Sequence, residues 1–85
     1  MRNKICLLGM KDIQDFLSII KDVDGKIEVF NPNTGYRVSG RSMLGLIIAT
    51  SEWGGETWIE SEVDIYDNIE KYIVISDNDA ANIHN

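Results

Sequence analysis

The residues with the clearest chemical potential lie at 39–48, which read Ser-Gly-Arg-Ser-Met-Leu-Gly-Leu-Ile-Ile. A polar start followed by an apolar run predicts a short helix that begins near Ser42. A serine just before a helix accepts a hydrogen bond from a backbone N–H group that has no partner within the helix. The helix dipole gathers positive potential at the same end, which favours a phosphate there. The segment therefore predicts either a plain helix cap or a phosphorylation site at Ser42.

The helix expected from about Ser42 to Thr50 is apolar on nearly all sides. One helix cannot bury every face against one sheet, so some of its apolar side chains should be exposed. Exposed apolar clusters often mark protein interfaces. Met43, Leu44 and Ile47 are thus candidates for a partner-binding surface or, equally, for the core. We expect the adjacent Arg41 to pair with an acidic or phosphorylated group.

Other reactive residue types lack the spacing that a catalytic or metal site needs. His84 stands alone in a polar tail, without a Cys or His partner at ligand spacing. We expect the single cysteine, Cys6, to be a buried strand residue, and one cysteine gives no disulfide framework. Glu56, Glu60 and Glu62 are better explained as a solvent-facing acidic strand than as metal ligands. Gly-rich phosphate loops and nucleophile elbows are also missing from the sequence, so we predict neither metal, cofactor nor enzyme activity.

Length and charge further narrow the functional classes to which the protein can belong. The 85 residues carry a net charge of −6. Residues 1–51 hold seven Lys or Arg and five Asp or Glu, while residues 52–85 hold one Lys and nine Asp or Glu. An acidic chain without a basic stripe is a poor nucleic-acid binder, and no apolar run is long enough to span a membrane. We expect a single domain over residues 1–75, a polar, frayed tail over 76–85, and a cytoplasmic location.

Periodicity predicts the elements that position Ser42. Residues 4–8 suggest a strand, and Ile13, Phe16, Leu17 and Ile20 have the spacing of one helix face, with Asp24-Gly25 ending the helix. Residues 26–30 and 36–39 read as a hairpin around a strong turn signal at 31–35.

The second half of the chain continues the pattern after the helix at 42–50. Residues 56–62 alternate as a strand, and helical spacing returns at Ile65, Ile69, Tyr72 and Ile73, with an i,i+4 pair expected between Asp67 and Lys71. The order β-α-β-β-α-β-α predicts an α+β open-faced sandwich: a four-stranded antiparallel sheet covered on one face by three helices. Pattern does not predict the order of strands in the sheet.

Residues 41–45, Arg-Ser-Met-Leu-Gly, resemble the regulatory-serine segment of HPr, the small phosphocarrier of the sugar phosphotransferase system. In that family the segment typically reads Lys-Ser-Ile-Met-Gly, and the predicted element order is also that of the family. The resemblance implies an HPr-like fold and phosphorylation of Ser42 by a dedicated kinase. It also implies that Met43, Leu44 and Ile47 match the exposed apolar positions through which HPr meets its partners.

The resemblance fails at the catalytic histidine. HPr proteins carry Gly-Ile-His-Ala-Arg-Pro-Ala where the first strand meets the first helix, whereas residues 8–13 here read Leu-Gly-Met-Lys-Asp-Ile. Gly9 falls at the histidine position and has no side chain to phosphorylate. Lys11 falls at the arginine position, and Asp12 replaces the proline with a negative charge. The resemblance therefore does not imply phosphocarrier activity.

The sequence thus predicts a non-catalytic HPr-like regulatory or adaptor protein that presents the Ser42 helix to a protein partner. The partner classes implied are a phosphotransferase-system component, a serine kinase or a transcription regulator. Two alternatives stay open at this point. One is a phosphocarrier with an unusual acceptor, and the other is an unrelated small α+β interaction module that could form a homodimer.

Overall fold

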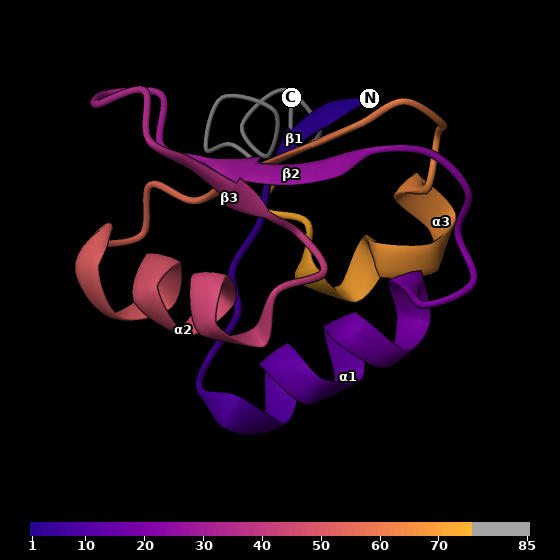
Figure 1. Cartoon of the computed structure of the whole chain (residues 1–85), viewed down its shortest axis with the longest axis horizontal. Helices are drawn as coiled ribbons and strands as arrows, with labels where there is room; N and C mark the ends of the chain where they lie inside the picture. The colour runs from indigo at the N-terminus through magenta and orange to yellow at the C-terminus, as the bar shows by residue number, and fades with distance from the viewer. Residues whose placement is uncertain (76–85) are drawn as a thin grey trace, which may run out of the picture.

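The computed structural model describes residues 1–75 and folds them into one sheet with helices on one side (Figure 1). The sheet has four antiparallel strands in the order β1-β4-β2-β3, and three α-helices pack beneath it. The predicted α+β class and element order are confirmed, while the predicted tail at 76–85 lies outside the described residues. In chain order the elements are β1 (Arg2–Lys4), α1 (Met10–Ile20), β2 (Ile27–Phe30), β3 (Arg37–Ser39), α2 (Met43–Glu52), β4 (Trp58–Ser61), α3 (Tyr66–Ile69) and the one-turn 3₁₀ helix η1 (Glu70–Tyr72).

The first strand begins earlier and is shorter than predicted. β1 pairs with β4 over residues 2–4, and Ile5 forms an isolated antiparallel bridge with Ile73 on its other side. Side chains alternate along this extended segment, so Ile5 and Leu7 are buried while Cys6 is exposed. The prediction of a buried Cys6 is therefore wrong, because it assigned an apolar character to every position of a segment that only half faces the core.

The β2–β3 hairpin has the turn that its sequence predicts. The Asn31 side chain accepts a hydrogen bond from the Asn33 N–H at 2.8 Å, and the Gly35 N–H donates to the Asn31 carbonyl at 2.8 Å. Gly35 has a φ of 81°, a conformation that glycine adopts without steric cost. The turn returns the chain as β3, which leads directly to the Ser42 segment.

The core lies between the sheet and the helices. Phe16 of α1 is fully buried and meets the Tyr72 ring edge-on, with 6.3 Å between the ring centroids. Ile27, Val29 and Ile59 face the helices, and Leu17 of α1 is only partly buried against the core cluster. The buried apolar cluster consists of Ile5, Leu7, Ile13, Phe16, Ile20, Ile27, Val29, Leu46, Ala49, Trp53, Ile59, Ile65, Ile69 and Tyr72.

The last helical segment is short, and its predicted ion pair is wrong. α3 ends at Ile69 and tightens into η1, which moves Lys71 off the face that Asp67 occupies. The Lys71 ammonium instead lies 2.5 Å from an Asp15 carboxylate oxygen, and the Tyr72 hydroxyl donates to the same oxygen. These two contacts tie the end of the described chain to α1.

The Asp15 contacts predict a loss of stability in acid. Hydrogen bonds from Lys71, and then from Tyr72, lower the pKa of Asp15 below its usual value. A lowered folded-state pKa gives a stabilisation that is fully present above the unfolded value of about 3.9 and is lost as the pH falls through the folded value. We expect Asp15→Asn to lower the melting temperature at about pH 7 but to have little effect at about pH 2. An equal effect of the substitution at both pH values would contradict this assignment.

Candidate functional site

Ser42 caps α2, as its position in the sequence predicts. It has an extended backbone just before the helix, and its hydroxyl oxygen accepts a hydrogen bond from the Gly45 N–H at 3.0 Å. Its carbonyl accepts the first helical hydrogen bond, from the Leu46 N–H at 2.9 Å. In an α-helix the N–H groups of the first residues, here Met43 and Leu44, have no partner within the helix. The half-buried Ser42 hydroxyl therefore stands beside backbone donors that suit an anion.

A tight connection between β3 and α2 holds Ser42 in this place. The Gly40 N–H donates to the Ile27 carbonyl at 2.9 Å, and a Cβ atom at Gly40 would lie only 2.5 Å from the Ile27 Cγ2 atom. Only glycine allows the chain to pass β2 so closely. The Ser42 N–H then donates to the Ser39 carbonyl at 3.1 Å, which completes the turn into the helix. The Ser39 hydroxyl adds a side-chain contact to this turn by accepting from the Arg41 N–H at 3.2 Å.

Gly45 sets the distance between α2 and the sheet. A Cβ atom at this position would lie 3.0 Å from the Val38 Cβ atom of β3 and 3.3 Å from the Ser42 side chain. Its absence lets the first turn of α2 lie against β3. This close approach explains why the glycine of the 41–45 segment follows the serine by three residues.

The exposed apolar side chains of α2 form a surface next to Ser42, which we call the α2 patch: Met43, Leu44 and Ile48. Leu44 is 67% exposed, and Met43 and Ile48 are 43% and 39% exposed. Ile47, which the sequence reasoning included, is half-buried and packs against the core cluster. Ile48 was missed, although it follows Leu44 by four residues and so lies on the same helix face.

Arg41 does not point its charge into open solvent beside Ser42. Its guanidinium Nη1 donates to the Gly25 carbonyl at 3.0 Å, and Nη2 donates to the Val23 carbonyl. Both acceptors belong to the loop between α1 and β2. The sequence reasoning expected this side chain to pair with an external acidic group, and in this structure its partners are internal.

Gly9 stands at the start of α1 with a φ of 85° and offers no side chain there. The nearby Asp12 carboxylate accepts a hydrogen bond from the Leu8 N–H at 2.7 Å, which helps the chain turn into the helix. An open depression of about 490 Å³ lies beside it, which no sequence motif predicts. Its lining residues are Cys6, Leu8, Lys11, Asp12, Asp15, Lys71 and Tyr72.

The two carboxylates of this depression are hydrogen-bonded within the protein. The Asp15 carboxylate is held by Lys71 and Tyr72, and the Asp12 carboxylate by a backbone N–H. The Cys6 thiol and the Lys11 ammonium complete the polar lining. Both carboxylates of the depression therefore have a hydrogen-bond partner within the protein.

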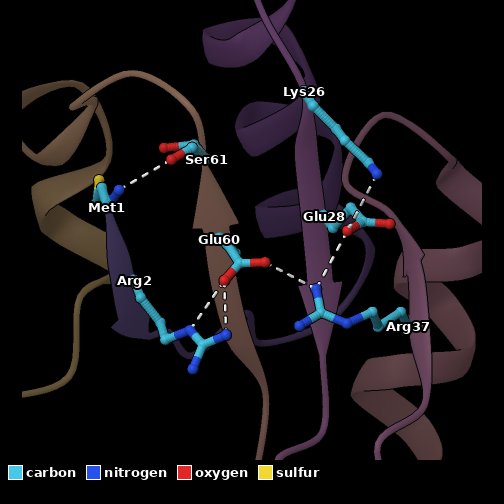
Figure 2. Close-up of polar contacts among 7 residues, drawn as sticks. All are labelled: Met1, Arg2, Lys26, Glu28, Arg37, Glu60 and Ser61. Carbon is cyan, nitrogen blue, oxygen red and sulfur yellow. Dashed lines mark hydrogen bonds and ion pairs between the residues drawn. The ribbon is translucent and has the colours of Figure 1, made fainter.

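The outer face of the sheet carries a network of ion pairs, shown in Figure 2. The Glu60 carboxylate accepts hydrogen bonds from Arg2, at 2.6 Å for Nη2, and from Arg37 at 2.9 Å. Arg37 also pairs with Glu28 at 3.1 Å, and the Lys26 ammonium lies 3.7 Å from the same Glu28 oxygen. The two arginines hold the pKa of Glu60 below its usual value. These carboxylates are thus neutralised by cations of the protein itself.

The guanidinium groups of this network also cover an aromatic side chain. Arg2 and Arg37 lie 4.8 Å and 4.7 Å from the centroid of the Phe30 ring, which is buried although it faces away from the core. Within residues 1–75, no group of three or more His, Cys, Asp or Glu side chains is arranged to hold a metal ion. His84 lies outside that range. No helix among the described residues is long and apolar enough to cross a membrane.

Comparison with known proteins found no relative of this chain. No family model matches the chain. No curated protein and no solved structure matches it either. The geometry of the Ser42 segment and the α2 patch therefore carries the functional argument.

Proposed function

We propose that this protein is a non-catalytic regulatory or adaptor protein of HPr-like architecture, located in the cytoplasm, that binds a protein partner through the start of α2. The observation that carries the proposal is the exposure of Met43, Leu44 and Ile48 directly beside the Ser42 hydroxyl. Apolar side chains that a short helix leaves in water are typical of protein interfaces. The resemblance of residues 41–45 to the regulatory-serine segment of HPr supports the same surface.

Phosphorylation of Ser42 is the proposed control. A kinase would join the Ser42 oxygen to the γ-phosphorus of a nucleoside triphosphate, with loss of the nucleoside diphosphate and transfer of the hydroxyl proton to a base of the kinase. The phosphate would lie beside the N–H groups of Met43 and Leu44, where the helix dipole favours negative charge. Its remaining oxygens would accept hydrogen bonds from an arginine of the partner. The partner classes that the resemblance supports are a phosphotransferase-system component or a transcription regulator, and a serine kinase would act on the same surface.

The start of α1 supports the non-catalytic part of the proposal. By the resemblance, Gly9 falls at the position of the histidine in the HPr motif, and it has no side chain that could receive a phosphoryl group. The neighbouring Asp12 places a negative charge in the first turn of α1, where it would repel an incoming phosphate. Transfer from a histidine-type donor should therefore fail.

A phosphotransfer assay with two donor systems tests the proposal. With phosphoenolpyruvate and the general phosphotransferase kinase, we expect no acid-labile phosphoryl group on the protein. With a nucleoside triphosphate and an HPr serine kinase, we expect an acid-stable phosphate that maps to Ser42 and is absent from Ser42→Ala. Stoichiometric acid-labile labelling would instead identify a phosphocarrier with an unusual acceptor. Acid-stable labelling that persists in Ser42→Ala would exclude Ser42 as the control site.

A further inference from the structure

Arg41 joins the start of α2 to a loop that follows α1. Its guanidinium donates to the carbonyls of Val23 and Gly25, 18 and 16 residues away in the sequence. Both are neutral acceptors; Gly25 is exposed, while Val23 is half-buried and packs against the core cluster. Arg41 is also the residue directly before Ser42, so one short stretch contains the modification site and the link to the loop.

The link has a physical reason in α1. The last turn of α1 contains no basic residue, and Lys21 at the C-cap is the nearest cation in the sequence to its carbonyl end. The Val23 N–H donates to the Ile20 carbonyl at 3.1 Å, which extends the helix end into the loop. Arg41 brings its cation to the carbonyl side of this extension. The guanidinium thus adds a second cation, after that of Lys21, at the carbonyl end of α1.

We propose that a phosphate on Ser42 draws the Arg41 guanidinium away from these carbonyls and so releases the first part of the α1–β2 loop, residues 21–25. The proposal rests on the proposed function, since it takes Ser42 as the modified residue. A phosphoserine carries a charge of about −1.5 to −2 and three acceptor oxygens. Arginine binds phosphate through paired hydrogen bonds between opposite charges, whereas its two present acceptors are uncharged carbonyls. The adjacent phosphate therefore outcompetes two carbonyls for the same guanidinium.

The far end of the loop should not move. The Lys26 N–H donates to a Glu62 carboxylate oxygen at 2.6 Å, and the Glu62 N–H donates back to the Lys26 carbonyl at 3.1 Å. Neither bond involves Arg41. Release is therefore confined to the segment between the end of α1 and Lys26, and the amide of Lys26 serves as an internal reference for the amide of Val23.

Amide hydrogen exchange on protein with phosphoserine encoded at position 42 tests this inference. We expect exchange at Val23 to rise about tenfold, equivalent to ~1.4 kcal/mol of local opening, while exchange at Lys26 stays constant. Arg41→Gln without phosphate should accelerate amide exchange at Val23 by the same factor. Phosphoserine at position 42 of the Arg41→Gln protein should cause no further increase in that exchange. Phosphoserine encoded at the exposed Ser51, at the other end of α2, is the matched control and should leave Val23 unchanged.

The outcomes separate this inference from the proposed function. Unchanged exchange at Val23 in the phosphorylated protein would overturn the release, and so would equal acceleration at Val23 and Lys26, which indicates general destabilisation. An additive effect of phosphate and Arg41→Gln would overturn the role of Arg41. Since the phosphoserine is encoded, none of these results depends on a kinase or a partner. If Val23 is released but no kinase modifies Ser42 and no partner binds the α2 patch, the proposed function fails alone.

Discussion

Replacing Phe16 with alanine is expected to lower the free energy of unfolding by about 3–5 kcal/mol, the usual cost of emptying a fully buried phenylalanine site. Phe16 has no exposed surface, and its ring meets Tyr72 edge-on beneath the sheet. The loss combines the lost burial of the ring with the cavity that remains, since the surrounding side chains relax only in part. A domain of this size has little stability in reserve, so the variant should be largely unfolded near physiological temperature.

Chemical and thermal denaturation followed by circular dichroism would measure this effect. Lys21→Ala, at an exposed position just after α1, is the surface control. Phe16→Leu is the second comparison, because it keeps much of the buried volume and should retain much of the lost stability. If the melting temperature of Phe16→Ala falls no further than that of Lys21→Ala, the assignment of Phe16 to the core between α1 and the sheet is wrong.

Local periodicity predicted the helix and the strand that turn one apolar face toward the core. The spacing of Ile13, Phe16 and Ile20 placed one side of α1 in the core, and the alternation of Ile27 and Val29 did the same for β2. The turn at 31–35 was equally readable, because Asn and Gly supply the special backbone geometry themselves. In these segments the residue types alone determine local structure.

Predictions failed where a distant partner decides the local structure. The extended segment at 5–7 bonds to Thr57 on one side and to Tyr72 and Ile73 on the other, and the alternation of its side chains leaves Cys6 exposed. Lys71 pairs with Asp15 because the chain tightens into a 3₁₀ turn before the predicted helix can place it over Asp67. Sequence spacing holds no information on either contact, because both join segments more than 50 residues apart.

The candidate site divides in the same way. The Ser42 cap could be predicted, since it depends only on a hydroxyl at a helix start. The exposed face of α2 could not, because a helix that is apolar on nearly all sides gives no periodic signal for its orientation. The contacts with β3 that Gly45 allows turn Ile47 toward the core and Ile48 toward water. The internal partners of Arg41 likewise depend on how the α1–β2 loop folds back onto the α2 start.

Replacing Leu44 with glutamate is expected to abolish binding of the partner while leaving the fold intact. Leu44 is the second residue of α2 and is 67% exposed, so the substitution removes little buried surface. A carboxylate in the first turn of a helix is favoured by the helix dipole, so the melting temperature should not fall. In a complex, the same charge would be buried against the apolar surface of the partner. We expect affinity to fall ~30-fold or more, the loss of about 2 kcal/mol that defines an interface hot spot.

Tyr36→Glu is the matched control, because Tyr36 is 68% exposed and lies in the hairpin turn instead of on α2. Affinity capture from the source cells should recover a partner with wild type and Tyr36→Glu but not with Leu44→Glu, and isothermal titration with that purified partner should give the affinity ratio. Ile47→Glu is unsuitable for this purpose, since Ile47 packs against the core and its substitution should unfold the protein. A Leu44→Glu protein that melts normally and retains every partner with unchanged affinity would show that the α2 patch is not the binding surface, and that the resemblance to HPr at residues 41–45 does not extend to function.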